Sequence, residues 1–124
     1  MNNYTSQVKS KKLVELGLDP ESADMCWGLD AESGMYYNHP YPMPWKDYTA
    51  KEFYIPCWSV GALINLMPEQ IEEVKDHKID LWVSHRGVWY FDETGLQHGP
   101  TFTGELIDAC YDMVVWLLRN NHLK

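Results

Sequence analysis

The clearest hydrophobic pattern in the chain is a pair of alternating segments, residues 79–84 and 88–92, separated by His85-Arg86-Gly87. A three-residue loop with Gly87 in the left-handed conformation predicts a β-hairpin that pairs Ser84 with Val88. In this register one face is apolar and carries Ile79, Leu81, Val83, Trp89 and Phe91. The other face is mixed, would meet water or a partner, and carries Asp80, Trp82, Ser84, Val88, Tyr90 and Asp92. A two-residue Arg86-Gly87 turn would shift the pairing and require a positive φ at Arg86, so we favour the longer loop.

The C-terminal segment has the periodicity of a helix that Thr103 caps and that extends to about Asn120. At 100° per residue its charged positions fall on one narrow stripe, which consists of Glu105, Asp108, Asp112 and Arg119. Apolar residues cover most of the remaining surface. We therefore expect this helix to be largely enclosed and to pack against the sheet.

The N-terminal half predicts shorter elements. A first helix should end before Gly17, with Gly17 in the left-handed conformation and Leu18 packed on Leu13. Asp19 is expected to cap a short turn, residues 25–27 to form a strand, and residues 35–37 to return as a hairpin partner.

A second strand is expected over residues 53–55, because Pro56 cannot donate a ladder hydrogen bond and should close it. Ser59 is then expected to cap a short helix that runs through Leu66 and is ended by Pro68. Gly61 and Ala62 remove side-chain bulk from this helix, so we expect it to be buried.

Together these elements predict an α+β protein. A small, mainly antiparallel sheet around the hairpin should be packed by the C-terminal helix and by the short helix of residues 59–66. No repeat, low-complexity tract or Gly/Ser linker divides the sequence, so residues 1–124 are expected to form a single domain.

Three segments carry a resemblance to a known family. Residues 54–68 contain Pro-Cys-Trp-Ser-x-Gly-Ala-Leu-x-x-Leu-x-Pro, residues 16–25 read Leu-Gly-Leu-Asp-Pro-Glu-Ser-Ala-Asp-Met, and residues 113–118 read Met-Val-Val-Trp-Leu-Leu. The chain resembles a set of small proteins from gut bacteria and their prophages that have no assigned activity, cofactor or catalytic residue. The resemblance implies a bacterial or phage-encoded intracellular accessory protein, and it favours a protein partner.

Charge limits the classes of partner. The chain has 10 Lys and Arg against 18 Asp and Glu, a formal net charge of -8 and a pI near 4.9. Phosphate backbones and anionic membranes attract clustered cations, so we expect neither nucleic acid nor a membrane as partner. The first residues do not resemble a secretory signal, and the isolated cysteines Cys26, Cys57 and Cys110 fit a reducing compartment, so a cytoplasmic location is expected.

Candidate catalytic groups are sparse. Cys57 precedes a predicted helix start and could act as a nucleophile with His85 or His98 as base, although a buried structural thiol fits the same position. Asp80 and Asp92, opposite each other in the favoured register, could form a carboxylate pair, or could be strand ends held apart by water. The histidines are scattered and no phosphate-binding glycine motif occurs, so we predict no catalytic, metal or cofactor site.

Aromatic residues give the best surface candidate, because the chain has six Trp, eight Tyr and three Phe. In residues 35–45, alternating prolines hold Tyr41 and Trp45 in an extended segment, while Trp82 and Tyr90 lie on the mixed hairpin face. These four rings form the predicted interaction surface, and the alternative is that they pack on the protein's own loops. The leading hypothesis is a non-enzymatic interaction or accessory protein, with a homodimer as one form. The rival hypotheses are a small hydrolase or transferase using Cys57 and an acidic inhibitor that mimics DNA.

Overall fold

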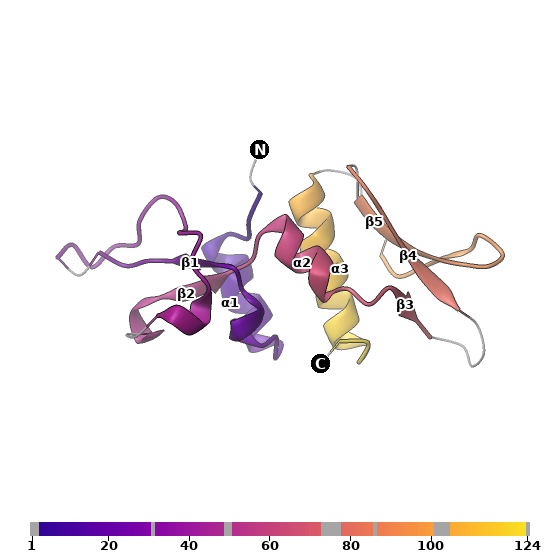
Figure 1. Ribbon diagram of the computed structural model, residues 1–124, viewed down its shortest axis with the longest axis horizontal. Coiled ribbons are helices and arrows are strands. Elements are labelled where there is room, and N and C mark those ends of the chain that lie inside the picture. The colour runs from indigo at the N-terminus through magenta and orange to yellow at the C-terminus, as the bar shows by residue number, and fades with distance from the viewer. Residues whose placement is uncertain are drawn as a thin grey trace.

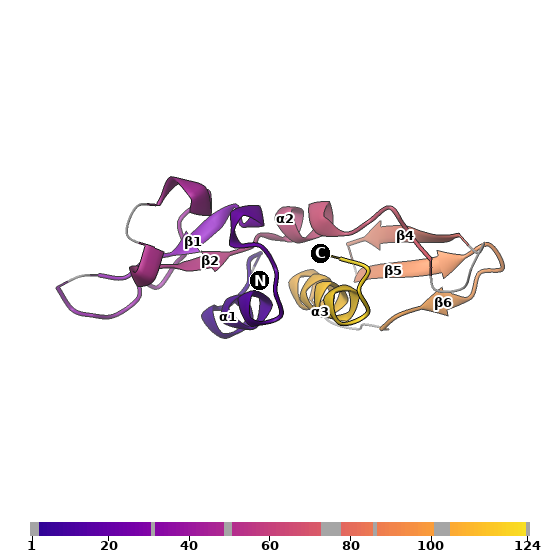
Figure 2. The same cartoon turned by 90° about the horizontal axis from the view of Figure 1, so that it is seen from below.

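Two antiparallel sheets lie on opposite sides of a pair of helices (Figure 1 and Figure 2). This computed structural model describes residues 3–30, 32–48, 51–72, 78–85, 87–100 and 105–123. The first sheet pairs β1 (Met25–Trp27) with β2 (Ile55–Cys57). The second has the order β3 (Gln70–Ile71), β4 (Ile79–Ser84), β5 (Gly87–Asp92) and β6 (Gln97–His98). The α+β class is therefore confirmed, with two sheets where one was expected.

Three α-helices occur in the described residues: α1 (Gln7–Glu15), α2 (Val60–Leu66) and α3 (Leu106–Arg119). Helix α1 packs against β2, while α2 and α3 stand between the two sheets. One buried cluster joins Leu13 of α1, Trp58 and Leu63 to α3 and to Tyr90 of the second sheet. Among the described helices, none has the length and apolar character needed to cross a bilayer.

Helix α3 packs against both β5 and α2, as its nearly continuous apolar surface predicts. Its charged stripe, which consists of Glu105, Asp108, Asp112 and Arg119, is exposed. The buried positions are Ile107, Ala109, Cys110, Met113, Val114 and Leu117. The helix begins after Glu105, whose side chain makes no capping bond, and the expected cap Thr103 lies outside the described residues.

The end of α1 confirms the predicted glycine cap. Gly17 has a φ of 98°, and its N–H donates to the Val14 carbonyl at 3.0 Å. The Leu18 N–H donates to the Leu13 carbonyl at 3.0 Å, so both side chains are drawn into the core. These two bonds form a Schellman motif, which satisfies carbonyls that the helix leaves unpaired.

Helix α2 is capped as expected but is not enclosed. The Ser59 hydroxyl accepts a hydrogen bond from the Ala62 N–H at 3.1 Å, and Asp19 likewise caps the short 3-10 turn Pro20–Ser22. Only Leu63 of α2 is buried, whereas Gly61 is exposed. The prediction of a buried helix was therefore wrong, because α2 packs on α3 with one face and borders a surface pocket with the other.

Strand β2 begins later than predicted, and Pro56 lies inside it. Phe53 belongs instead to a 3-10 turn, Lys51–Phe53. Cys26, which stands opposite Pro56, exchanges both of its backbone hydrogen bonds with Tyr41, at 2.9 and 2.7 Å. The Cys26–Pro56 position is therefore a non-hydrogen-bonded pair, where the missing N–H of proline costs nothing. Residues 35–37 form no strand, although the chain does turn back through a bridge between Leu29 and Tyr36.

The register of the β4–β5 hairpin differs from the prediction by one residue. Ser84 pairs with Gly87 and Val83 with Val88, so the loop contains only two residues, of which Arg86 lies outside the described residues. A one-residue shift reverses the faces of a strand, so Val88 and Tyr90 are buried while Trp89 turns outward. Gly87 does not take the predicted left-handed conformation but lies in the strand, where its missing side chain leaves room for the Trp89 ring, which an added Cβ would approach within 3.2 Å.

Candidate functional site

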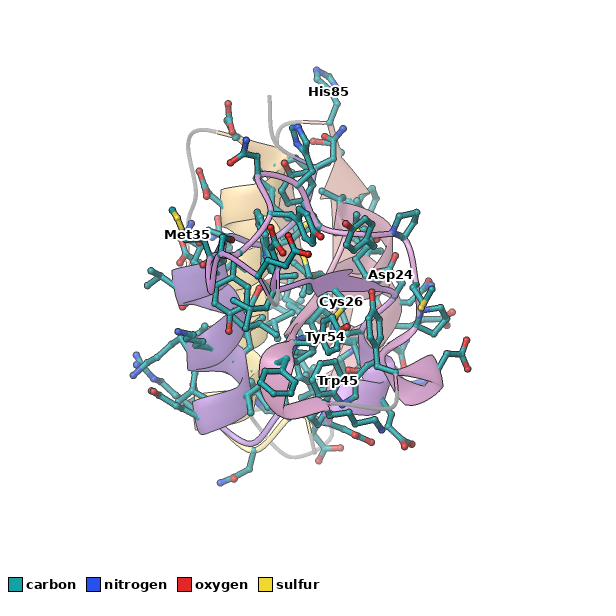
Figure 3. The ribbon with its side chains drawn as sticks, turned by 90° about the vertical axis from the view of Figure 1, so that its left-hand side faces the viewer. Asp24, Cys26, Met35, Trp45, Tyr54 and His85 are labelled. Atoms are coloured by element: carbon teal, nitrogen blue, oxygen red, sulfur yellow. The ribbon has the colours of Figure 1, made fainter. Side chains whose placement is uncertain are left out.

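The described residues between 35 and 54 form what we call the aromatic end of the molecule, which faces the viewer in Figure 3. The exposed large hydrophobic side chains of this region are Met35, Tyr37, Tyr41, Met43 and Phe53. The segment is nevertheless held in place, since Tyr41 bridges to Cys26 of β1 and Pro40 is buried. The region therefore combines a fixed backbone with accessible rings.

The rings of the aromatic end contact one another in two groups. Tyr48 lies between Trp45 and Tyr54, with ring centres 6.3 and 4.3 Å away. Tyr37 meets Tyr41 edge to face at 5.6 Å. The Tyr41 ring lies against Gly28, where an added Cβ would come within 2.8 Å of it. These contacts fix the direction of several rings without burying them completely.

A pocket of about 450 Å³, which we call the Trp45 pocket, opens between α1 and the aromatic end. Its walls include Val14 of α1, Trp45, Tyr54 and Pro56, and Figure 3 shows Trp45 and Tyr54 on this side of the molecule. Lys11 and Lys51 also line it. The Lys51 ammonium lies 5.7 Å from the centre of the Trp45 ring, within the range of a cation–π interaction.

A second pocket of about 470 Å³, the Tyr41 pocket, adjoins the first. It is lined by Tyr37, Tyr41, Met43, Tyr48 and Tyr54, and Tyr54 borders both pockets. Both volumes lie within the range of about 300–1,000 Å³ that is typical of binding sites for small groups. The aromatic end can therefore receive two side chains or ring systems next to each other.

The four predicted surface rings divide into three environments. Tyr41, which is 42% exposed, and the partly buried Trp45 come together at the aromatic end. Trp82 is 61% exposed and lies in β4, at the other end of the molecule. Tyr90 is fully buried, and its hydroxyl donates to the Pro68 carbonyl at 2.7 Å. Tyr90 is therefore a core residue, since the hairpin register turns it toward α3.

Sequence reasoning missed Tyr54, Lys51 and Lys11, which complete the Trp45 pocket. Tyr54 was interpreted as a strand residue, although it follows the 3-10 turn Lys51–Phe53. Lys51 lies six positions after Trp45, a spacing that carries no local signal. Lys11 belongs to a different helix, so only the packing of α1 beside β2 brings it to the pocket.

Cys57 lies in β2 and not at a helix start, because Ser59 is the cap of α2. Its side chain is fully buried, and the thiol donates to the Thr5 carbonyl at 3.3 Å. Burial raises the pKa of Cys57 to about 11. The candidate bases belong to the second sheet and its hairpin, with His85 exposed in the loop between β4 and β5 and His98 in β6. A protonated, enclosed thiol of this kind is a poor nucleophile.

The predicted carboxylate pair does not form. Asp80 stands opposite Phe91 and accepts a hydrogen bond from the Gln70 side chain at 2.8 Å. Asp92 instead closes the turn before β6, where it binds the Thr94 hydroxyl and, at 3.0 Å, the His98 ring. The hydrogen bond from the Thr94 hydroxyl, and after it the one with His98, are the largest causes that hold the pKa of Asp92 well below its usual range. This geometry describes a structural turn rather than an acid–base pair.

Metal ligation has no support in the described part of the chain, where no group of three His, Cys, Asp or Glu side chains could hold an ion. No protein-family model, curated protein or solved structure matches the sequence. The resemblance to proteins of gut bacteria and their prophages therefore stays a prediction.

Proposed function

We propose that this chain is a non-enzymatic interaction module that binds a protein partner through its aromatic end. The observation that carries the proposal is the concentration of exposed apolar side chains there. Among the described residues, five of the ten exposed large hydrophobic side chains fall between positions 35 and 53. Contiguous apolar surface that is bordered by polar groups is typical of interaction sites.

The chemistry of the rings supports the same proposal. Tyrosine and tryptophan offer large rigid contact areas with few rotatable bonds, so they lose little entropy on binding. The backbone that carries Tyr41 and Trp45 is already held in place. Backbone hydrogen bonds fix it at Tyr41, and the 3-10 turn Trp45–Asp47 fixes it at Trp45. A surface arranged before binding reduces the entropic cost of association.

The rival hypotheses gain nothing from the geometry. Cys57 is enclosed, and its pKa of about 11 leaves the thiol protonated near neutral pH. An acidic DNA mimic needs a continuous row of carboxylates, whereas the acidic residues of this chain are spread over several segments of the sequence. Both remain predictions, and alkylation of Cys57 tests the first of them.

Photo-crosslinking tests the proposal directly. The photoreactive residue p-benzoylphenylalanine would replace Tyr41 at the aromatic end in one variant and Trp82 in β4 in a matched control. We expect the first variant, in a bacterial lysate, to form a discrete adduct that excess unlabelled wild-type protein suppresses. Excess Trp45→Ala protein should suppress it much less, whereas Trp82→Ala protein should act like wild type.

The proposal would be contradicted if only the variant with the photoreactive residue at position 82 formed an adduct that excess wild-type protein suppresses. It would also be contradicted if excess Trp45→Ala protein suppressed the adduct from position 41 as fully as wild type does. Circular dichroism must first show that Trp45→Ala is folded, because Trp45 also packs against the main buried cluster. A second copy of this chain is the simplest partner. Light scattering after size-exclusion chromatography, at increasing protein concentration, would detect such a homodimer.

A further inference from the structure

We propose that the Trp45 pocket binds an acidic segment of the partner protein. An apolar side chain of that segment enters the pocket, and its carboxylates lie beside Lys11 and Lys51. This inference rests on the proposed function and specifies the chemistry of the partner. It follows from the walls of the pocket and from the distribution of positive charge around it.

The walls of the pocket favour an apolar group. Val14, Pro20, Ile55 and Pro56 supply aliphatic surface, and Trp45 supplies an aromatic face. At about 450 Å³ the pocket can hold one large side chain with its adjoining backbone. Removing that side chain from water would supply most of the binding energy.

The rim of the pocket favours negative charge. The first 66 residues contain five basic side chains, namely Lys9, Lys11, Lys12, Lys46 and Lys51. Lys11 of α1 and Lys51 line the pocket, and Glu15 of α1 lines it as well. The charged side chains that line the pocket, two lysines and one glutamate, carry a net positive charge, which is opposite in sign to the formal net charge of -8 of the whole chain.

The ion pairs of the described residues do not involve the two lysines of the pocket, so both ammonium groups are available to a ligand. In the described part of the chain, Lys9 pairs with Asp108 and Lys12 lies 4.0 Å from Glu15, and neither pair involves Lys11 or Lys51. Repulsion from distant carboxylates falls off within about 8 Å at physiological ionic strength. Glu15 also lines the pocket, but its carboxylate lies 4.0 Å from Lys12, so Lys11 and Lys51 are the two cations of the lining that no ion pair of the described residues involves.

A basic segment is the alternative ligand for this pocket, because aromatic rings can also bind cations. Here the Lys51 ammonium already lies over the Trp45 ring, and Lys11 lines the same pocket. A second cation would have to displace Lys51 and approach Lys11. The two lysines thus select against basic segments as well as for acidic ones.

An unbiased selection tests this preference. A phage library that displays random 12-residue peptides would be selected on the immobilised full chain, with recovery compared between wild type and Trp45→Ala. We expect peptides recovered in a Trp45-dependent manner to combine Asp or Glu with a neighbouring aromatic or aliphatic residue. Fluorescence anisotropy of the synthesised peptides would then give their affinities.

Charge reversal supplies the decisive measurement. The double variant Lys11→Glu, Lys51→Glu should weaken binding of the selected peptide about tenfold or more, because two attractive contacts become repulsive. The matched control Lys78→Glu, Arg119→Glu makes the same change in net charge at two exposed positions outside the pocket and should bind like wild type. Binding to wild type should also weaken several-fold as NaCl rises from about 50 to about 500 mM.

The outcomes separate the two proposals. Trp45-dependent recovery of basic or uncharged peptides would overturn the acidic preference and leave the aromatic end as the binding site. Equal losses in the pocket variant and in Lys78→Glu, Arg119→Glu would also overturn it, since the effect would then arise from total charge. Recovery that is identical on wild type and Trp45→Ala would overturn both proposals.

Discussion

Trp82 stands directly opposite Trp89 in the β4–β5 ladder, so both indoles lie on the face of the sheet that turns away from α3. The partner valines occupy the other face, where Val88 is buried while Val83, nearer the hairpin loop, is 45% exposed. This relationship decides which residues of the hairpin belong to the core. It also gives the register a direct test.

Val88→Ala is expected to lower the free energy of unfolding by about 2 kcal/mol, because it removes two buried methyl groups and leaves a cavity. Val83→Ala should change it by less than about 0.5 kcal/mol. Urea unfolding of both variants provides the comparison. The three-residue loop expected from sequence would reverse the order of the two effects, since it buries Val83 and exposes Val88.

Substitution by alanine at two glycines, Gly17 and Gly61, should change the stability of the protein in opposite directions. Gly17→Ala is expected to destabilise the protein by about 1 kcal/mol, because Gly17 has a φ of 98° that alanine adopts only with strain. Gly61→Ala should stabilise it by about 0.5–1 kcal/mol, since Gly61 is helical and an added Cβ would meet only the Ser59 hydroxyl, at 3.8 Å. Thermal unfolding measures both. A loss at both positions would contradict the exposed placement of α2.

Asp92 should make the stability depend on pH. Its pKa in the folded protein lies below its ordinary value, because the Thr94 hydroxyl and, as the second largest cause, the His98 side chain form hydrogen bonds with its carboxylate. The unfolded chain therefore takes up the proton first, near pH 4, so the stabilisation is complete above about pH 5 and declines as the pH falls further. The melting temperature of Asp92→Asn, relative to wild type, should be lowest near pH 7 and approach the wild-type value toward pH 2.5.

Thr94→Val is the companion variant, because it keeps the carboxylate and removes the hydroxyl that contributes most to the shift. Its stability should vary less with pH than that of wild type. An unchanged pH profile in both variants would show that the turn at Asp92 does not stabilise the fold.

Cys57 should resist alkylation in the folded protein. Burial raises its pKa to about 11, and no thiolate forms near neutral pH in an enclosed site. We expect iodoacetamide to leave Cys57 unmodified between pH 6 and 8 while it modifies the urea-unfolded chain, as peptide mass spectrometry would show. Rapid modification of folded protein at pH 6 would instead revive the hypothesis of a cysteine-dependent enzyme.

The local signals in the sequence were reliable where a few neighbouring residues supply the whole interaction. The Gly17 cap, the Asp19 and Ser59 caps and the charged stripe of α3 all appear as predicted. Each depends on hydrogen bonds or helical spacing within one or two turns of chain. Tyr41 and Trp45 are less simple, since Tyr41 bridges to Cys26 and Trp45 begins the 3-10 turn Trp45–Asp47 instead of continuing an extended segment.

Tertiary packing decided the rest. The alternating pattern of residues 79–92 fits two registers, and α3 selects the one that buries Val88 and Tyr90, while the bare backbone of Gly87 accommodates Trp89. Pro56 enters a strand because Tyr41, and not β2, accepts and donates the hydrogen bonds of Cys26. The Trp45 pocket likewise needs Lys11 from α1 and Tyr54 from the segment before β2, which lie 43 positions apart in the sequence. Such contacts arise between distant segments, so only their arrangement in space determines them.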